Sequence, residues 1–425
     1  MKLIKRFSAV LLSFLMILSL CACNTFNKKE LKSSGEKKEK SSAAQKGNKT
    51  ITKEEYEALK KSKGKTTKSG QSTVSSPKAV KNPAPSNDSE EEIEEKDPIT
   101  KISSAADLIE FSNTVYEGHN YNGVTVTLEK DINLAGVNFI PIGSSNTSFQ
   151  GVFNGKNHSI SNLTINSLDG ITAGLNDNMT SVGLFGATLN AKISDLKLDN
   201  ISINVSGEYN TTLVVGGLVG YFSSTGTATL KNIKATGKII AKSLNNTMWN
   251  GGIVGNLDIG SNQTVCKNLL SSVNLESDCG MIYTGGIMGS LYADAADAVS
   301  LSDFIYKGSI LQVDSIYADI GGVCGFIKSD SNLSIRNCFV NCKINSKGEE
   351  FNNRHALVGG ESTIYSSLKV LNSFGYCNSS SEIVNTNFVL GTFDTVNCNF
   401  GGIPKNFKFG DQWNLTNRDN PDFNF

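Results

Sequence analysis

The chain has 425 residues, and its 40 Lys and Arg balance 40 Asp and Glu, so the formal net charge is zero. It contains only three histidines, and none belongs to a His-Glu-x-x-His motif, which excludes that type of zinc peptidase site. The zero net charge hides a basic first part and an acidic second part.

The first residues have the features of a bacterial lipoprotein signal. A basic start precedes an uncharged, largely apolar run over 7–20, which is too short to span a bilayer but suits a secretory signal. The run ends in Leu20-Cys21-Ala22-Cys23, which resembles a lipobox. We predict a signal peptide over 1–22, lipidation of Cys23 and a membrane anchor on the bacterial surface. The alternative is an ordinary cleaved signal with incidental cysteines.

Residues 23–98 are rich in Lys, Ser, Gly and Thr and contain few large apolar residues. The part 24–82 has 16 Lys and 6 Glu, a net charge of +10, and an acidic stretch follows over 87–98. This composition cannot bury enough apolar surface to offset the entropy of ordering, so we predict a disordered tether. Because it follows a secretory signal, we expect a solvated spacer near the membrane or wall and no nucleic-acid partner.

The folded part begins with a helical pattern. Ser104 and Asp107 have the spacing of a capping box, and Leu108, Phe111 and Val115 recur at helical intervals. We therefore predict a short amphipathic helix that covers the open end of the first coil of a stacked domain. The N-terminal cap and the first coils are expected over 99–181.

A glycine motif then recurs at intervals of 34 to 36 residues. It reads VGLFG, GGLVG, GGIVG, GGIMG and GGVCG, and a degenerate LVGGE follows. Such regular recurrence is typical of solenoid proteins. The repeat glycines are Gly183, Gly186, Gly217, Gly220, Gly252, Gly255, Gly286, Gly289, Gly322 and Gly325.

Each unit over 182–400 contains three short apolar segments separated by turn-forming residues, without helical periodicity. This pattern predicts an all-β fold, a single-stranded, right-handed parallel β-helix in which one repeat makes one coil. A β-propeller fits less well, because its blades need four strands in about 40–45 residues.

Two columns of residues should stack from coil to coil. The Gly-Gly sites would allow either a positive φ or a close approach of backbones. Leu218 and Val219, like their counterparts in later repeats, are both apolar, and both cannot point inward from a flat strand, so a bulge or a covering loop is required.

A second column should form a ladder of stacked polar side chains at turns. Because its carboxylates lie in register with asparagines, we expect a structural role for them in preference to a catalytic one. The column comprises Asp195, Asn232, Asn268, Asp303 and Asn337.

The glycine motifs resemble the GLUG-motif repeat family of secreted and surface proteins of bacteria, which includes non-catalytic portions of some IgA-cleaving metallopeptidases. The resemblance covers roughly 100–400, although family versions tend to have Asp where this chain has Asn133 and Asn154. It implies a β-helix and surface exposure, and no shared enzymatic activity. The end of the chain is similar to a closing segment of such proteins, so we expect 401–425, with Trp413, to cap the far end.

Residues with catalytic chemistry are sparse. Cys266, Cys338 and Cys377 occupy apolar repeat positions and are expected in the core, while a Cys338–Cys342 disulfide is left open. The histidines are His119, His158 and His355, and we assign a function to none of them.

Two further features bear on catalysis. Asp294 and Asp297 share one loop and could form a carboxylate pair, but Arg336 and Arg354 are not aligned on a common face. No calcium-binding Gly-Gly-x-Gly-x-Asp repeat occurs. We therefore predict no catalytic residue, no metal site and no cofactor, and a protein that is not an enzyme.

Together these features predict a cell-surface lipoprotein whose β-helix acts in adhesion, binding a polysaccharide or host ligand, including a cell-wall polymer or a protein. Candidate binding surfaces are a lateral face and the loops 169–180 and 293–299. One alternative is a passive structural or accessory module of the cell envelope, and another is a polysaccharide lyase or glycoside hydrolase. Exposed aromatic residues along one face would favour glycan binding, and converging carboxylates would favour an enzyme. The sequence does not indicate an oligomeric state.

Overall fold

The computed structural model describes residues 98–168, 179–207, 211–346, 352–362, 368–371, 373–378, 411–418 and 420–425. The predicted signal peptide, Cys23, almost all of the tether and most of the loop 169–180 lie outside the described residues. Among the residues described, no helix has both the length and the apolarity that crossing a bilayer requires.

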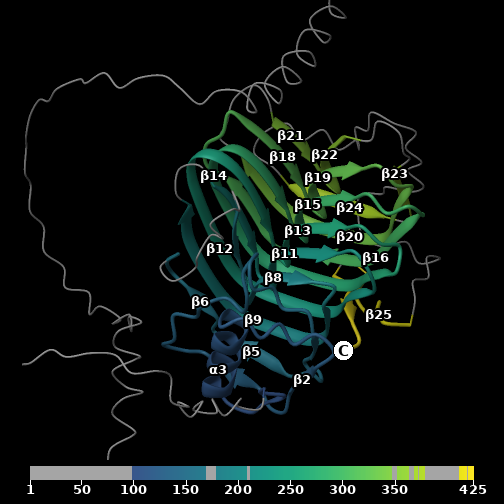
Figure 1. Cartoon of the computed structure of the whole chain (residues 1–425). Helices are drawn as coiled ribbons and strands as arrows, with labels where there is room; N and C mark the ends of the chain where they lie inside the picture. Colours follow the sequence, from purple (N-terminus) through teal and green to yellow (C-terminus); the bar gives the residue numbers. More distant parts are fainter. Residues whose placement is uncertain are drawn as a thin grey trace, which may run out of the picture. The chain divides into compact units, whose positions relative to one another are not determined.

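The N-terminal helix α3 (Ala105–Tyr116) begins with the capping box that the sequence predicts. Ser104 Oγ accepts a hydrogen bond from the Asp107 backbone N–H at 3.2 Å, and the Asp107 carboxylate accepts one from the Ser103 N–H at 2.8 Å. Phe111 is fully buried, and its ring contacts those of Tyr121 and Phe149. The helix therefore covers the first coils with its apolar face (Figure 1).

Short strands build the coils beneath this helix. They are β1 (Lys101–Ile102), β2 (Thr125–Leu128), β3 (Ile132–Asn133), β4 (Val152–Asn154), β5 (Ser159–Ser161), β6 (Thr164–Ile165) and β7 (Met179–Val182). The strand β1 pairs with β2, β2 with β4 and β4 with β9, always in parallel. Each coil therefore rests on the next.

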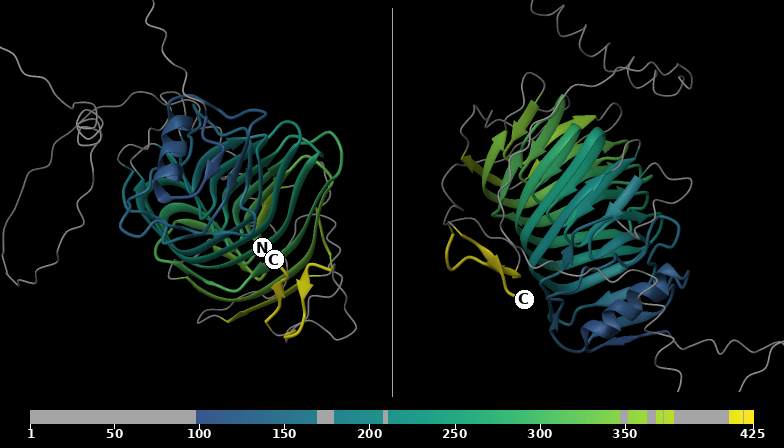
Figure 2. Two further views of the ribbon diagram at one scale, coloured as in Figure 1. Left: turned by 90° about the horizontal axis from the view of Figure 1, so that it is seen from below. Right: turned by 90° about the vertical axis from the view of Figure 1, so that its left-hand side faces the viewer.

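The repeat region continues this stack. Its strands are β8 (Phe185–Leu189), β9 (Lys192–Gly207), β10 (Thr212–Gly216), β11 (Val219–Ser224), β12 (Ala228–Gly251), β13 (Val254–Ile259), β14 (Thr264–Gly285), β15 (Met288–Ala293), β16 (Val299–Tyr306), β17 (Ser309–Gln312), β18 (Tyr317–Gly321), β19 (Cys324–Ser329), β20 (Leu333–Ser346), β21 (Asn352–His355), β22 (Val358–Ser362), β23 (Leu368–Leu371) and β24 (Phe374–Asn378). Strands β8, β11, β13, β15, β19 and β22 form a six-stranded sheet, with one strand from each coil (Figures 1 and 2).

The pairing register confirms the parallel β-helix. Gly216 pairs with Gly251, Gly251 with Gly285 and Gly285 with Gly321. Residues paired on neighbouring coils are therefore 34 to 36 residues apart in the sequence, which is the period of the glycine motif. Aliphatic side chains from successive coils form one continuous core. The structure is thus held together by contacts between each coil and its two neighbours.

The strands are longer than the three short segments per repeat that the sequence suggests. β12 runs for 24 residues and β14 for 22 residues, and the two pair with each other around corners of the coil, with a register shift between Ser243 and Thr247. Within β12, Asn232 at φ 56° and Gly237 at φ 130° have positive φ, and Asn232 turns the strand at the corner with the polar ladder. A single such residue bends the chain while its neighbours remain extended, so the three segments merge.

The predicted ladder of polar side chains at these corners is confirmed. All five of its residues have φ between 56° and 65°. Asn232 Nδ2 donates to Asp195 Oδ1 at 2.6 Å, and Asn268 Nδ2 donates to Asn232 Oδ1 at 2.7 Å. Asn337 Nδ2 donates to Asp303 Oδ1 at 3.0 Å. Both carboxylates of the column therefore have the structural role that was expected.

The Gly-Gly sites allow close approach of backbones. None of the repeat glycines in the described chain has φ in the left-handed region. A Cβ on Gly252 would overlap the carbonyl oxygen of Gly286, and one on Gly286 would overlap that of Gly322. The final glycine of each motif approaches the preceding coil, because a Cβ on Gly289 would lie 2.6 Å from Gly255 O. Both columns of glycines therefore form contacts between coils that no side chain can enter.

A sharp turn at each Gly-Gly site explains the two consecutive apolar residues. Leu218 and Val219 are both fully buried in the core, and their two N–H groups donate to the same acceptor, Ile253 O, at 2.9 and 3.1 Å. Two residues on one coil thus face one on the next, as in a β-bulge. The bulge recurs in the later coils, and the chain turns there between one sheet and the other.

The C-terminal hairpin does not cap the end of the β-helix. Its strands β25 (Trp413–Asn414) and β26 (Asp422–Phe423) pack Trp413 and Phe423 against a row of apolar side chains from successive coils. That row comprises Leu270, Ile305, Phe339 and Phe374. Trp413 Nε1 also donates to Asp303 Oδ1 at 2.8 Å. The hairpin is therefore a lateral cover, and the predicted C-terminal cap over 401–425 is wrong for its described part, because these rings find apolar partners on the side of the coils (Figure 2).

Candidate functional site

A group of aromatic and acidic side chains lies where the two sheets meet at the Gly-Gly turns. We call it the aromatic–acid patch. It comprises Tyr221, Trp249, Asp258, Tyr283, Tyr292, Tyr317, Asp319 and Phe326, which come from β11, β12, β13, β14, β15, β18 and β19.

One row of the patch comes from the strand ends that precede the Gly-Gly turns. Trp249 pairs with Tyr283, and Tyr283 pairs with Asp319, so the three lie one above another on successive coils. Neighbouring Met248 and Ile282 belong to the core. Because successive residues of a strand point to opposite faces, this row points away from the core.

The other row comes from the six-stranded sheet. Tyr292 lies on β15, and its ring centroid is 5.6 Å from that of Trp249. The rings of Phe326 and Tyr283 are 4.9 Å apart, and those of Tyr283 and Tyr317 are 6.2 Å apart. All five rings are only partly buried. The Gly-Gly turns therefore bring aromatic side chains of two sheets together on one face.

Asp319 is the buried acid of the patch. Its side chain is fully inaccessible to solvent, with Tyr317 Oη donating to Oδ2 at 2.9 Å and Asn353 Nδ2 donating to Oδ1 at 2.6 Å. Burial raises the pKa of this carboxyl to about 7, and the two hydrogen bonds offset only part of that effect. Burial, with the nearby Asp319 charge, also raises the pKa of the Tyr283 hydroxyl. Asp319 therefore changes charge near neutral pH.

Asp258 is the second acid of the patch and is half-buried. Tyr221 Oη donates to its Oδ2 at 2.6 Å. Burial raises the pKa of Asp258, and the charge of Asp294 contributes in the same direction. Burial and the Asp258 charge raise the pKa of Tyr292 to about 12, so this tyrosine remains a neutral hydroxyl.

The candidate carboxylate pair of the sequence falls at the border of this patch. Asp294 and Asp297 are both exposed after β15. Asn262 Nδ2 donates to Asp297 Oδ2 at 2.9 Å, whereas Asp294 lies near enough to Asp258 to affect its titration. The two aspartates thus have different partners. Arg336 is exposed on β20 and Arg354 is half-buried on β21.

The histidines and cysteines do not converge on the patch. His158 lies beside Asp131, with 3.2 Å between Nδ1 and Oδ1, while the His119 ring contacts Tyr121 and His355 is buried on β21. The described cysteines are buried. Within the ranges that the structure describes, no three His, Cys, Asp or Glu side chains are grouped to hold a metal ion.

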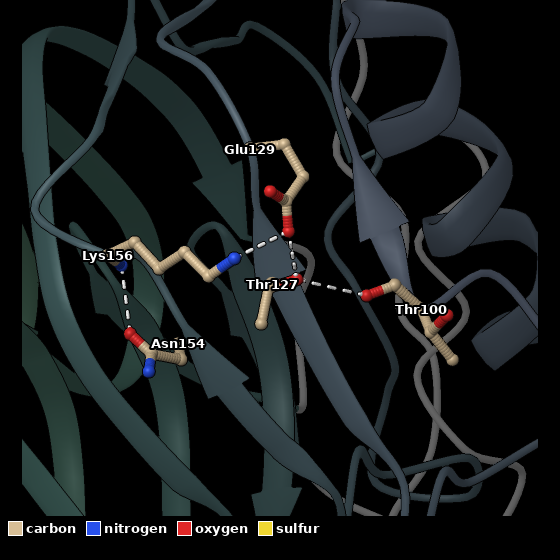
Figure 3. A network of polar contacts seen from close by, with 5 residues as sticks. All are labelled: Thr100, Thr127, Glu129, Asn154 and Lys156. Atoms are coloured by element: carbon tan, nitrogen blue, oxygen red, sulfur yellow. Dashed lines mark hydrogen bonds and ion pairs between the residues drawn. The ribbon is translucent and has the colours of Figure 1, made fainter.

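A second polar network lies on the N-terminal coils (Figure 3). Glu129 Oε1 accepts hydrogen bonds from Lys156 Nζ at 2.6 Å and Thr127 Oγ1 at 2.7 Å, and the Lys156 hydrogen bond lowers the pKa of Glu129 most. Asn154 Oδ1 accepts from the Lys156 backbone N–H at 2.8 Å, so it shapes the turn. These groups, of which only Lys156 is exposed, satisfy one another, and we assign no ligand to them.

The patch was not predicted from the sequence, although the repeats contain a signal for it. Trp249, Tyr283 and Asp319 each stand three residues before the second glycine of a Gly-Gly site. Aligning the repeats upstream of the motif would have revealed the column. The contacts with Tyr292 and Phe326 depend on the turn itself and are not visible in the spacing.

The sequence matches no family profile and no curated protein. Among solved structures, the chain is similar to a crystal structure described as that of a candidate immunoglobulin A1 protease from Bacteroides ovatus. The two share 16% sequence identity with a TM-score of 0.49, and the match covers 76% of this chain and 91% of that chain.

Proposed function

We propose that the β-helix is a non-catalytic adhesion module that binds a neutral polysaccharide through the aromatic–acid patch. The observation that carries this proposal is the convergence of partly exposed rings, above all Trp249, Tyr283 and Tyr292, on one face over successive coils. A sugar ring has a face of C–H groups and a rim of hydroxyls, so it packs on an aromatic ring while its hydroxyls reach polar neighbours.

The geometry suits a polymer better than a single sugar. Successive coils are about 4.8 Å apart, so a row of rings on several coils offers repeated contacts along a chain. Between Tyr221 and Phe326, which lie in register on the same sheet, the buried Asn256 and Ser290 hydrogen-bond to each other, with Ser290 Oγ donating to Asn256 Oδ1 at 2.7 Å, so they fix the spacing of the rings and leave the contact with the polymer to the exposed groups. A polymer that spans several such contacts gains affinity from each of them.

The charges near the patch favour a neutral polymer over a polyuronate. Asp258 belongs to the patch, and Asp294 lies beside it. Lys328, in register with Tyr292, is the cation that the neighbouring strand supplies. A polyanion would therefore approach more negative than positive charge, which costs binding energy.

The positions of the carboxylates support binding without cleavage. Asp319 has no accessible surface, and both of its oxygens already accept hydrogen bonds. Asp258 is engaged by Tyr221. A glycosidase needs two carboxyl groups that reach the scissile bond from the two sides of the sugar. The lyase or hydrolase alternative is tested together with the binding proposal.

Replacing Trp249 or Tyr292 by Ala should weaken retention by a neutral polymer about 10-fold or more, because each ring lost is a central contact. Native affinity electrophoresis in gels containing mannan, xylan or mixed-linkage β-glucan measures this, with polygalacturonate as the acidic comparison. Phe425→Ala is the matched control, since Phe425 is a half-buried ring on the C-terminal hairpin.

We expect retention without release of reducing ends or unsaturated products. Retention that survives both patch substitutions would contradict the assigned surface. Failure of the wild-type protein to bind any of the neutral polymers would contradict the proposal. It would favour the alternative function, a passive structural or accessory module of the cell envelope. Product formation would favour the enzyme.

We further propose that the chain reaches the cell surface as a lipoprotein anchored at Cys23. The support is the sequence alone, namely the apolar run over 7–20 followed by Leu20-Cys21-Ala22-Cys23. Cys23→Ser should abolish incorporation of radiolabelled palmitate. The variant protein should either appear in the medium or accumulate as a precursor that keeps its signal peptide. Unchanged labelling would contradict lipidation at this residue. Cys21→Ser, which should leave labelling intact, is the matched control.

A further inference from the structure

Two cysteines face each other inside the C-terminal coils. Cys342 on β20 pairs in register with Cys377 on β24, and their Sγ atoms are 2.8 Å apart. Both side chains are nearly buried, at 6% and 7% exposure. Unbonded heavy atoms pack best at about 3.5–4.0 Å, so these sulfurs are closer than ordinary packing brings them.

The backbone geometry permits a bond between them. Residues paired on neighbouring strands of a parallel sheet have Cα atoms about 4.8 Å apart, which lies within the range that disulfides span, roughly 4.4–6.8 Å. Both side chains point to the same interior, since each belongs to the core. Closing an S–S bond of about 2.05 Å requires the two sulfurs to approach by less than 1 Å.

The pair that the sequence left open is excluded by the strand. Cys338 and Cys342 are four residues apart on β20, so their Cα atoms are about 13 Å apart in extended chain. A disulfide cannot bridge Cα atoms more than about 7 Å apart without moving the backbone. The Cys338 backbone N–H instead donates a hydrogen bond to Ser373 Oγ at 3.2 Å.

We propose that Cys342 and Cys377 form a disulfide that cross-links the last described coils of the β-helix. The oxidant is a disulfide of the thiol–disulfide exchange class, such as glutathione disulfide or an oxidised dithiol protein. Each cysteine thiol loses a proton and one electron as the S–S bond forms, and the oxidant accepts both electrons and both protons to become two thiols. The bond forms during folding, because burial raises the pKa of the Cys342 thiol in the finished core.

The cross-link has a clear structural consequence. β23 and β24 pair only with β20 among the described strands, so within the described part of the chain their coil is the last of the stack. A terminal coil is the weakest part of a stack in which each repeat is stabilised by its neighbours. A covalent bond from β24 to β20 removes conformational freedom from the open form of that coil.

Peptide mapping of the full chain tests the bond. The protein is folded in a glutathione and glutathione-disulfide buffer, free thiols are alkylated, and non-reduced digests are analysed by mass spectrometry. We expect one linked peptide pair joining Cys342 to Cys377, with Cys266, Cys279, Cys324 and Cys338 alkylated after denaturation. Reduction should lower the thermal midpoint by roughly 5–10 °C.

Variants separate this pairing from the alternative. Cys342→Ser should leave Cys377 open to alkylation and remove the effect of reduction on the thermal midpoint, while Cys338→Ser, the matched control, should leave the linked peptide unchanged. Alkylation of both Cys342 and Cys377 in oxidised wild-type protein would overturn the proposal, as would a linked peptide containing Cys338. The wild-type map decides the question even where a variant does not fold.

Discussion

Replacing Gly286 by Ala should lower the free energy of unfolding by about 3 kcal/mol, at the upper end of the cost of overpacking. A Cβ at this position would overlap both the ring of Tyr306 and the carbonyl oxygen of Gly322 on the next coil. Neither group can move away, because Tyr306 is fully buried and Gly322 is itself in close backbone contact with Ala356 on the next coil. The clash therefore separates two coils that must touch.

Gly226→Ala is the matched control for this prediction. A Cβ at Gly226 would meet nothing nearer than the Asn190 side chain at 3.6 Å, which is ordinary contact. We expect its free energy of unfolding to stay within about 1 kcal/mol of the wild type. Urea denaturation followed by far-ultraviolet circular dichroism measures both variants. Equal stabilities for the two would refute the role assigned to the Gly-Gly columns.

The stability of the folded chain should fall as pH rises from about 4 to 7 because of Asp319. Its pKa in the folded protein is raised to about 7, so in this interval the folded state keeps a proton that the unfolded state has released. Stability therefore decreases with rising pH in this window and is insensitive to Asp319 above it. The total change for this one group is about 4 kcal/mol, at 1.36 kcal/mol per pH unit.

Asp319→Asn isolates this contribution. The amide cannot ionise, so the difference in unfolding free energy between wild type and variant should change steadily from pH 4 to 7, with the wild type losing stability relative to the variant. Urea titrations at several pH values measure it. Asp258→Asn provides a comparison, since its carboxyl is less buried and its pKa is raised for the same physical reason. A constant difference between wild type and Asp319→Asn would show that this carboxyl is already ionised at pH 4.

The fold could be predicted because its stabilising contacts repeat in the sequence. A spacing of 34 to 36 residues between glycine motifs is also the register of Gly216, Gly251, Gly285 and Gly321 in space. The polar ladder was predictable for the same reason, since Asn and Asp tolerate the left-handed conformation and recur at one position. In a stacked fold, periodicity in sequence gives contacts directly.

Contacts between residues that the 34-to-36-residue repeat does not relate were not predictable. The C-terminal hairpin binds the apolar row that includes Leu270 and Ile305, and nothing in the spacing says which face Trp413 covers. The close approach of Trp249 to Tyr292 requires the chain to turn sharply at the Gly-Gly site. The Cys342–Cys377 contact falls in the degenerate last repeat, where the motif no longer marks the register.

The emission of Trp249 tests the binding surface most directly. The chain has two tryptophans, Trp249 in the patch and Trp413 in the hairpin, so Trp249→Phe removes only the signal of the patch. The account predicts that a neutral polymer retained in the affinity gels changes wild-type emission in a saturable manner and leaves the Trp249→Phe protein unaffected. A retained polymer that leaves the Trp249 signal unchanged would contradict it.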